Sequence, residues 1–188
     1  MLTWMSGIPT AALGMPDIQV SIYPDQGRQR IVEIVLTYSQ ETAELERQKA
    51  ELERWTEQLS EPLAYLEGDE QIAGAIRAIL DTGVYDPEGG STANALLRDG
   101  LADSEGLALA LSALLQRLEV SCLMAQGTVD GQEHFWLVVQ TEGGWRHLDL
   151  SAPEEGGPLY TDRQLLDLGY AWKSDNLPAC TAQDEGAE

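Results

Sequence analysis

Residues 100–108 read Gly-Leu-Ala-Asp-Ser-Glu-Gly-Leu-Ala and lead into a segment with the apolar spacing of a buried helix. From Ser104 to Leu118 the leucines recur three and four residues apart, which predicts a single apolar face. Ala108 and Ala110 keep that helix narrow enough for burial. We therefore expect Ser104 at the start of a central helix, where the helix dipole stabilises negative charge.

A histidine and an aspartate follow on two predicted strands. The segments 134–140 and 145–150 are β-prone, and residues 142–144, Glu-Gly-Gly, predict the turn between them. His134 and Asp149 can then lie side by side on one face of a hairpin. The start of the central helix can pack against that face.

Ser104, His134 and Asp149 have the chain order of a nucleophile, a base and an orienting acid. His134 stands 30 residues after Ser104 and 15 before Asp149. In such a triad the carboxylate fixes the imidazole tautomer and the imidazole takes the proton of the nucleophile. The alternatives are a half-buried structural histidine and a carboxylate that holds a turn. His147, two residues before Asp149, is a rival base.

The three segments resemble those of the bacterial transglutaminase-like family, in its microbial cell-surface branch. The family pattern G-x-A-x-C-E-G-x-A resembles residues 100–108, H-A-W resembles 134–136, and W-x-H-x-D resembles 145–149. Three further stretches also resemble the family: 85–86, 170–172 and 178–180.

The resemblance implies an α+β, papain-like core with a central helix packed on an antiparallel β-sheet. In active relatives it implies acyl transfer or amide hydrolysis through a thioester. His134 and Asp149 match the family pattern, whereas Ser104 stands where the family has cysteine. Asp103 replaces an apolar residue and Phe135 a small one.

The serine changes the expected chemistry. A thiol can rest as a thiolate beside an imidazolium, whereas a serine hydroxyl must lose its proton during attack. The charge of Asp103 and the bulk of Phe135 disfavour catalysis further. We expect a catalytically inactive domain that acts as a binding or structural module. The alternative is an active hydrolase or acyltransferase that uses the triad of Ser104, His134 and Asp149.

Aromatic residues near these segments suggest a groove. Trp136 and Trp145, together with Asp103 and Phe135, could line a site for a peptide, protein or glycan. Packing of the tryptophans in the core, Trp172 included, is the alternative. No cofactor is expected, and the two histidines show no recognised metal-ligand spacing.

The rest of the chain completes an α+β pattern. Domain boundaries are expected at an N-terminal hairpin and amphipathic helix over 1–60, a core over 61–180 and a flexible tail over 181–188. Within these units the expected elements are a hairpin over 15–38, helices over 40–60, 69–82, 92–98 and 160–168, a loop over 85–90, and strands over 121–126 and 170–172.

The helix expected over 40–60 carries leucines seven residues apart. Leu45, Leu52 and Leu59 form a stripe to which Trp55 adds. The stripe fits a coiled-coil partner or the core of the domain itself, and packing in the core is favoured because three heptads are barely enough for a coiled coil.

The composition limits the partners. The 188 residues carry a net charge of −21, with 32 acidic and 11 basic side chains, which disfavours binding to nucleic acid or anionic lipid. No apolar stretch is long enough to span a bilayer, and residues 1–14 lack the basic start of a signal peptide. The family resemblance suggests an extracellular or cell-surface location. Cys122 and Cys180 form one disulfide or stay free.

Overall fold

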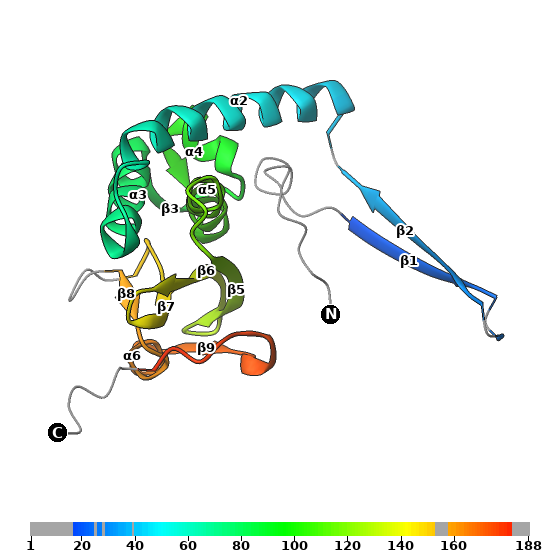
Figure 1. The fold of residues 1–188 in the computed structure, drawn as a ribbon. Helices are drawn as coiled ribbons and strands as arrows, with labels where there is room; N and C mark the ends of the chain where they lie inside the picture. Colours follow the sequence, from blue (N-terminus) through cyan, green and yellow to red (C-terminus); the bar gives the residue numbers. More distant parts are fainter. Residues whose placement is uncertain (1–16, 25, 28, 39, 153–157, 182–188) are drawn as a thin grey trace.

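A five-stranded antiparallel sheet forms the centre of the computed structural model (Figure 1). Its strand order is β8 (Leu159–Tyr160), β7 (Gly144–Leu148), β6 (Gln132–Thr141), β5 (Cys122–Val129) and β9 (Tyr170–Trp172). The sheet therefore contains the two adjacent strands that the sequence predicted for the histidine and aspartate segments, and the fold class is α+β.

The structure describes residues 17–24, 26–27, 29–38, 40–152 and 158–181. The predicted tail is thus almost wholly outside the described residues, as are Met15 and Pro16 of the predicted hairpin. Within the described ranges, no helix is both long and apolar enough to cross a membrane.

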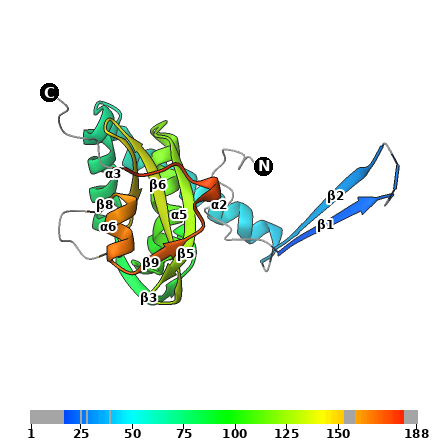
Figure 2. The same ribbon diagram turned by 90° about the horizontal axis from the view of Figure 1, so that it is seen from below.

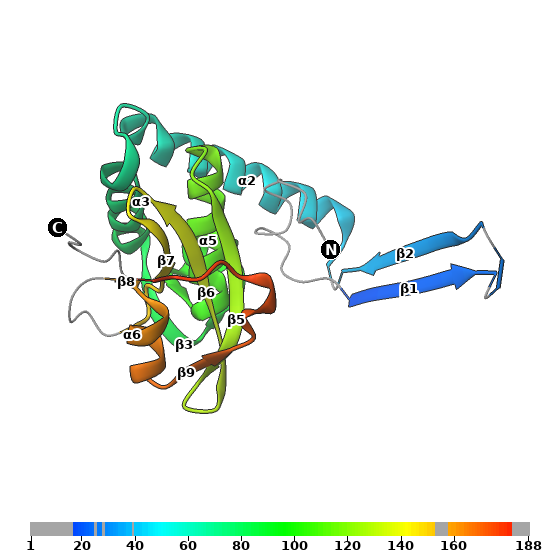
Figure 3. The same cartoon turned by 60° about the horizontal axis from the view of Figure 1, so that its bottom comes forward.

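Helices cover one face of the sheet (Figures 1 and 3). These helices are α2 (Thr42–Ser60), α3 (Gly68–Thr82), α4 (Ala93–Asp99) and α5 (Ser104–Arg117), and the short 3-10 turn η1 (Glu61–Leu63) follows α2. On the opposite face lie α6 (Asp162–Asp167) and the chain around η2 (Ser174–Asn176), as Figure 2 shows.

Strand β6 is buried on both faces because each face has its own core. Leu137 and Val139 point into the core beneath α5, whereas Trp136 and Val138 point into the core beneath α6. Side chains alternate across a strand, so a strand covered on both sides needs a continuous apolar run rather than an alternating one.

The long helix α2 belongs to the main core. Leu52 is fully buried there, and Trp55 and Leu59 pack against the same cluster. Of the two interpretations of its leucine stripe, packing within the domain therefore accounts for these three residues. The division of the chain at residue 60 remains a prediction.

One prediction about the connecting segments was wrong. Residues 85–90 were expected to form a loop, but β3 (Val84–Gly90) pairs in parallel with β4 (Leu101–Ala102), with an irregular register. The glycines allow this pairing, since a Cβ on Gly89 would lie 2.7 Å from the backbone of Ala102. The paired strands bring the segment before α5 against β3.

Two local features shape the C-terminal half of the chain. The turn between β5 and β6 lies at Asp130 and Gly131, both with positive φ, at 51° and 80°. Thr161 caps α6 in a full capping box with Gln164.

The N-terminal hairpin of β1 (Asp17–Tyr23) and β2 (Ile31–Thr37) was also confirmed. It extends away from the rest of the chain from the N-terminal end of α2, as Figures 1, 2 and 3 show from three directions. Among the described elements, β1 and β2 pack substantially only on each other.

Candidate active site

Ser104 is the first residue of α5, as the sequence predicted. Asp103 is the N-cap, and its carboxylate accepts a hydrogen bond from the Gly106 N–H at 2.9 Å and one from the Ser91 hydroxyl. Asp103 therefore has a structural role in starting the helix, and it also places a negative charge next to Ser104.

Gly106 allows the start of α5 to lie close to β3. A Cβ on Gly106 would lie 2.5 Å from the Gly90 carbonyl oxygen and 2.9 Å from the Ala102 side chain. No L-residue with a side chain fits there without a shift of the backbone. The glycine of the nucleophile segment thus fixes the position of Ser104 through packing.

His134 and Asp149 meet as expected. Their Nε2 and Oδ2 atoms lie 2.7 Å apart, and both side chains are buried. An ionised carboxylate only accepts hydrogen bonds, so Nε2 carries the proton and Nδ1 is left with its lone pair. This is the tautomer that a general base requires.

Asp149 is held by more than the histidine. Tyr170 donates to Oδ2 at 2.7 Å, and Ser151 donates to Oδ1 from its hydroxyl at 2.7 Å and from its backbone N–H at 2.8 Å. Burial alone would raise the pKa of Asp149, but the hydrogen bonds from His134 and Ser151 outweigh it and hold the pKa below its ordinary value. Burial and the neighbouring charge of Asp149 raise the pKa of Tyr170 far above its ordinary value.

The sequence did not predict roles for Tyr170 and Ser151. Tyr170 reaches the site because β9 pairs with β5, a long-range pairing with no local sequence signal. Ser151 lies two residues after Asp149, at the spacing at which a serine can bond back to a carboxylate, and that spacing could have indicated it.

A triad mechanism begins with a hydrogen bond from the nucleophile to the base, and Ser104 makes a different one. The Ser104 Oγ accepts a hydrogen bond from the Phe135 N–H at 3.2 Å, and no hydrogen bond joins it to His134 among the described residues. Ser104 is only 8% exposed. The cavity beside it, lined in part by Phe135 and Asp149, has a volume of about 10 Å³, at the lower limit for a single water molecule. Most of its lining comes from apolar core residues of α5 and β6, and His134 is not part of it.

His147 is not a rival base, because both of its ring nitrogens are engaged. Trp136 donates from Nε1 to Nδ1 at 2.9 Å, and Nε2 lies 2.8 Å from Asp162 Oδ1. Since Nδ1 accepts, Nε2 must carry the proton and donate it to Asp162. Burial lowers the pKa of His147, although the bond to Asp162 opposes this shift.

The same bonds argue against a metal centre at His147, Asp162 and Cys180, whose potential ligand atoms lie within 4.8 Å of one another. A protonated Nε2 has no lone pair for a metal ion. The Cys180 thiol is fully buried, and burial together with the charge of Asp162 raises its pKa to about 12. Cys180 and Cys122 are both free, so the alternative of a disulfide between them does not hold.

The predicted groove residues do not share one open surface. Trp136 is 1% exposed and packs edge-on against Tyr170 and Trp172, so it belongs to the core. Trp145 packs against the same core, and Phe135 lines the small cavity beside Ser104. A hollow of about 520 Å³ does occur near this cluster, between α6 and the chain after β9. It is lined by Asp162, Leu166, Trp172, Ser174, Leu177, Pro178 and Ala179.

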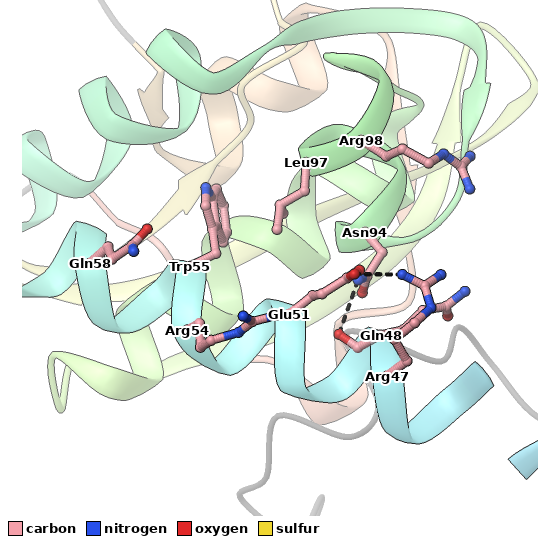
Figure 4. A pocket seen from close by; sticks show the side chains of 9 residues that line it. All are labelled: Arg47, Gln48, Glu51, Arg54, Trp55, Gln58, Asn94, Leu97 and Arg98. Atoms are coloured by element: carbon pink, nitrogen blue, oxygen red, sulfur yellow. Dashed lines mark hydrogen bonds and ion pairs between the residues drawn. The ribbon is translucent and has the colours of Figure 1, made fainter. Parts of the chain in front are cut away.

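A second hollow, of about 430 Å³, lies between α2 and α4 (Figure 4). Arg47, Arg54 and Arg98 line it, but Arg47 pairs with Glu51 and Arg98 with Asp99. The buried Asn94 donates to the Gln48 carbonyl oxygen at 3.0 Å, while its own side-chain oxygen is sealed from solvent and has no partner among the described residues. A ligand in the hollow could not reach that oxygen, so we assign no function to this hollow.

No family model matches the chain, and no curated protein matches it. Solved structures do resemble it. One is described as a TGase, with 12% identity and a TM-score of 0.45, over 80% of this chain and 47% of that one. A candidate cysteine protease from Cytophaga hutchinsonii has 10% identity and a TM-score of 0.47, over 68% of this chain and 45% of that one.

A third similar structure, a candidate protease from Parabacteroides distasonis, has 10% identity and a TM-score of 0.40. The match covers 72% of this chain and 39% of that one. The chain thus spans less than half the length of each of these structures. Similarity at this level concerns the fold alone and assigns no role to any residue.

Proposed function

We propose that this chain is a transglutaminase-like domain without catalytic activity, which serves as a binding or structural module at a cell surface. One observation carries the proposal. The Ser104 Oγ accepts a hydrogen bond from the Phe135 N–H, and the residue is only 8% exposed. The residue at the nucleophile position is thereby used as a hydrogen-bond acceptor in a closed site.

The chemistry of serine supports the same conclusion. Attack by Ser104 requires proton transfer to Nδ1 of His134 as the bond to the substrate carbonyl forms. The Ser104 hydroxyl would first have to make a hydrogen bond to His134, which it does not make among the described residues. The nearby carboxylate of Asp103 would then oppose the negative charge that develops on the oxyanion.

The retained His134 and Asp149 have a structural use that needs no reaction. Asp149 receives hydrogen bonds from Tyr170, on β9, and from Ser151, after β7. Together with His134, on β6, these bonds connect three separate segments of the sheet in a buried position. Removing one partner of a buried charge leaves the desolvation of that charge uncompensated, which is costly. Selection for stability would therefore retain the pair after activity is lost.

The hollow beside Trp172 is the part of the surface that best suits a ligand. Leu166, Trp172 and Leu177 give it apolar walls, and Asp162 gives it one acidic edge. An aromatic face next to a carboxylate fits the apolar face of a sugar or a peptide side chain with a cationic end. The net charge of −21 also favours cationic ligands.

The second candidate function is an active serine hydrolase or acyltransferase on peptide amides or esters. The observation in its favour is the 2.7 Å contact of His134 with Asp149, which leaves Nδ1 free to act as a base. In this alternative the Ser104 side chain changes rotamer and the Phe135 ring moves to open the cavity.

A fluorophosphonate probe separates the two candidates, because it reacts with an activated serine nucleophile. The proposal predicts that intact protein mass is unchanged after incubation with excess probe. A known serine hydrolase in the same tube checks the reagent. Labelling that maps to Ser104 and is lost in His134→Ala would establish the second candidate and refute the first.

A further inference from the structure

The hairpin of β1 and β2 has one entirely apolar face. Its register pairs Ile18 with Leu36, Val20 with Ile34 and Ile22 with Val32. Because side chains alternate across a strand, these three pairs lie on one side of the hairpin. We call these six residues the hairpin apolar face. The opposite face is mixed, because Gln19, Ser21 and Glu33 are polar there whereas Ile31 and Val35 are apolar.

Nothing in the described chain covers the hairpin apolar face. Its six side chains are 44–58% exposed, and the hairpin extends away from the helices and the main sheet (Figures 1 and 2). A two-stranded hairpin alone in water is marginally stable, and a contiguous apolar patch of this kind indicates an interaction surface. The hairpin therefore needs an apolar partner.

We propose that a second copy of this chain covers the hairpin apolar face, so that two hairpins stack face to face in a homodimer. Each of the six side chains offers about 100 Å² of surface, or about 600 Å² in one chain. Two copies then bury about 1,200 Å², which reaches the lower end of the range for specific protein interfaces. Sheets that stack in this way pack about 10 Å apart.

The face is suited to two-fold symmetry. The Val20–Ile34 pair lies between the Ile18–Leu36 and Ile22–Val32 pairs. A two-fold axis can lie between the two stacked hairpins and run perpendicular to their strands. It then places the Val20–Ile34 pair of one copy over the same pair of the second copy. The Ile18–Leu36 pair of each copy lies over the Ile22–Val32 pair of the other. All six side chains are aliphatic and of similar size, so the face can pack against a copy of itself, as an isologous interface requires.

This arrangement also limits electrostatic repulsion between two acidic chains. The hairpin apolar face carries no charge, and the α-helical part of each chain joins the hairpin at its Thr37 end. The two-fold axis places the α-helical parts of the two chains at opposite ends of the stacked hairpins. Seven-residue strands separate them by about 20 Å, more than the Debye length of about 8 Å at physiological salt. A projecting apolar hairpin lets two chains of net charge −21 associate.

Sedimentation velocity on the full chain between about 1 and 200 µM, in 150 mM salt, tests the dimer. We expect a species of twice the 20.5 kDa chain mass at the higher concentrations. The variant Val20→Lys/Ile34→Lys places two charges on the hairpin apolar face and should weaken association at least about 100-fold. Gln19→Lys/Ser21→Lys adds the same charge to the opposite face and should leave the dissociation constant within about threefold. Circular dichroism should show the same unfolding transition of the main core in both variants, since β1 and β2 pack substantially only on each other.

A chain that lacks residues 1–16 tests whether that segment, rather than a second copy of the chain, covers the hairpin apolar face. If residues 1–16 cover the face, the full chain is monomeric and the shortened chain dimerises or aggregates, which refutes the proposal. A monomer in both chains refutes it as well and leaves a different protein as the partner. A dimer that persists in Val20→Lys/Ile34→Lys would place the interface elsewhere and overturn the assignment.

Discussion

Tyr170 donates its phenolic hydrogen bond to Asp149 Oδ2 at 2.7 Å, the same oxygen that lies 2.7 Å from His134 Nε2. The tyrosine on β9 and the histidine on β6 are thus connected through one atom of a buried carboxylate. This relationship makes the pair of His134 and Asp149 part of the sheet's internal support.

Tyr170→Phe removes one of these bonds and leaves the packing of the ring intact. A hydrogen bond to a buried charged group contributes about 1.5–3 kcal/mol, so we expect the free energy of unfolding to fall by about 2 kcal/mol. Urea unfolding at pH 7 measures the change. Tyr65→Phe is the matched control, because Tyr65 is 90% exposed, and it should change stability by less than about 0.5 kcal/mol. Equal stability of the two variants would show that the bond to Asp149 is not important for the fold.

Gly106→Ala should destabilise the start of α5. The new Cβ would lie 2.5 Å from the Gly90 carbonyl oxygen, so either the helix or β3 must move. We expect a loss of about 2 kcal/mol or more, by the cost of overpacking a tight site. Gly131→Ala is the comparison, since a Cβ there meets no atom within 4 Å and the cost is only that of the positive φ. Chemical denaturation of both variants should rank Gly106→Ala as clearly the less stable.

Stability should depend on the protonation of His147. Its pKa is lowered in the folded protein, chiefly by burial, so the unfolded chain binds more protons between the folded pKa and 6.5. The stabilisation that neutral His147 gives the folded state is therefore complete above pH 6.5. It is lost as the pH falls below 6.5 toward the folded pKa, by at most about 1.4 kcal/mol per pH unit. His147→Gln keeps an acceptor for Trp136 and a donor for Asp162 without a titrating group. The pH dependence of unfolding between pH 7 and 5 should be shallower in this variant, and an unchanged slope would contradict the prediction.

Ser104→Cys alone should not produce an active enzyme. Residue 104 is only 8% exposed, so little of its side chain meets solvent whichever atom stands at the nucleophile position. We expect the new thiol to react with iodoacetamide more slowly than an exposed cysteine and to give no amine incorporation into glutamine peptides. Ser104→Cys/Phe135→Ala removes the bulk beside the base and should raise the alkylation rate over that of Ser104→Cys. Full activity in Ser104→Cys would mean that the cavity opens readily in solution.

The sequence allowed the chemistry-bearing residues to be placed because each has a local signal. The leucine spacing after Ser104 identified the helix, and the glycines after Thr141 identified the hairpin that brings His134 and Asp149 together. These features depend on neighbours along the chain, so propensity and periodicity reveal them.

The remaining features depend on contacts between distant segments. Tyr170 reaches Asp149 through strand pairing of β9 with β5, and β3 is a strand only because β4 lies beside it. Trp136 looked suited to a groove, but the strand is covered on both faces and its ring lies in the second core. No local pattern in a single sequence states which face of a strand a later helix will cover.

An assay of acyl transfer tests the claim that the site around Ser104 does not turn over substrate. Hydrolysis and amine incorporation would be measured on glutamine peptides and on small peptide esters, with the native chain and with Ser104→Ala side by side. We predict that the native rate equals that of Ser104→Ala and of buffer alone. A native rate above both, abolished in Ser104→Ala, would contradict the claim and establish Ser104 as a working nucleophile.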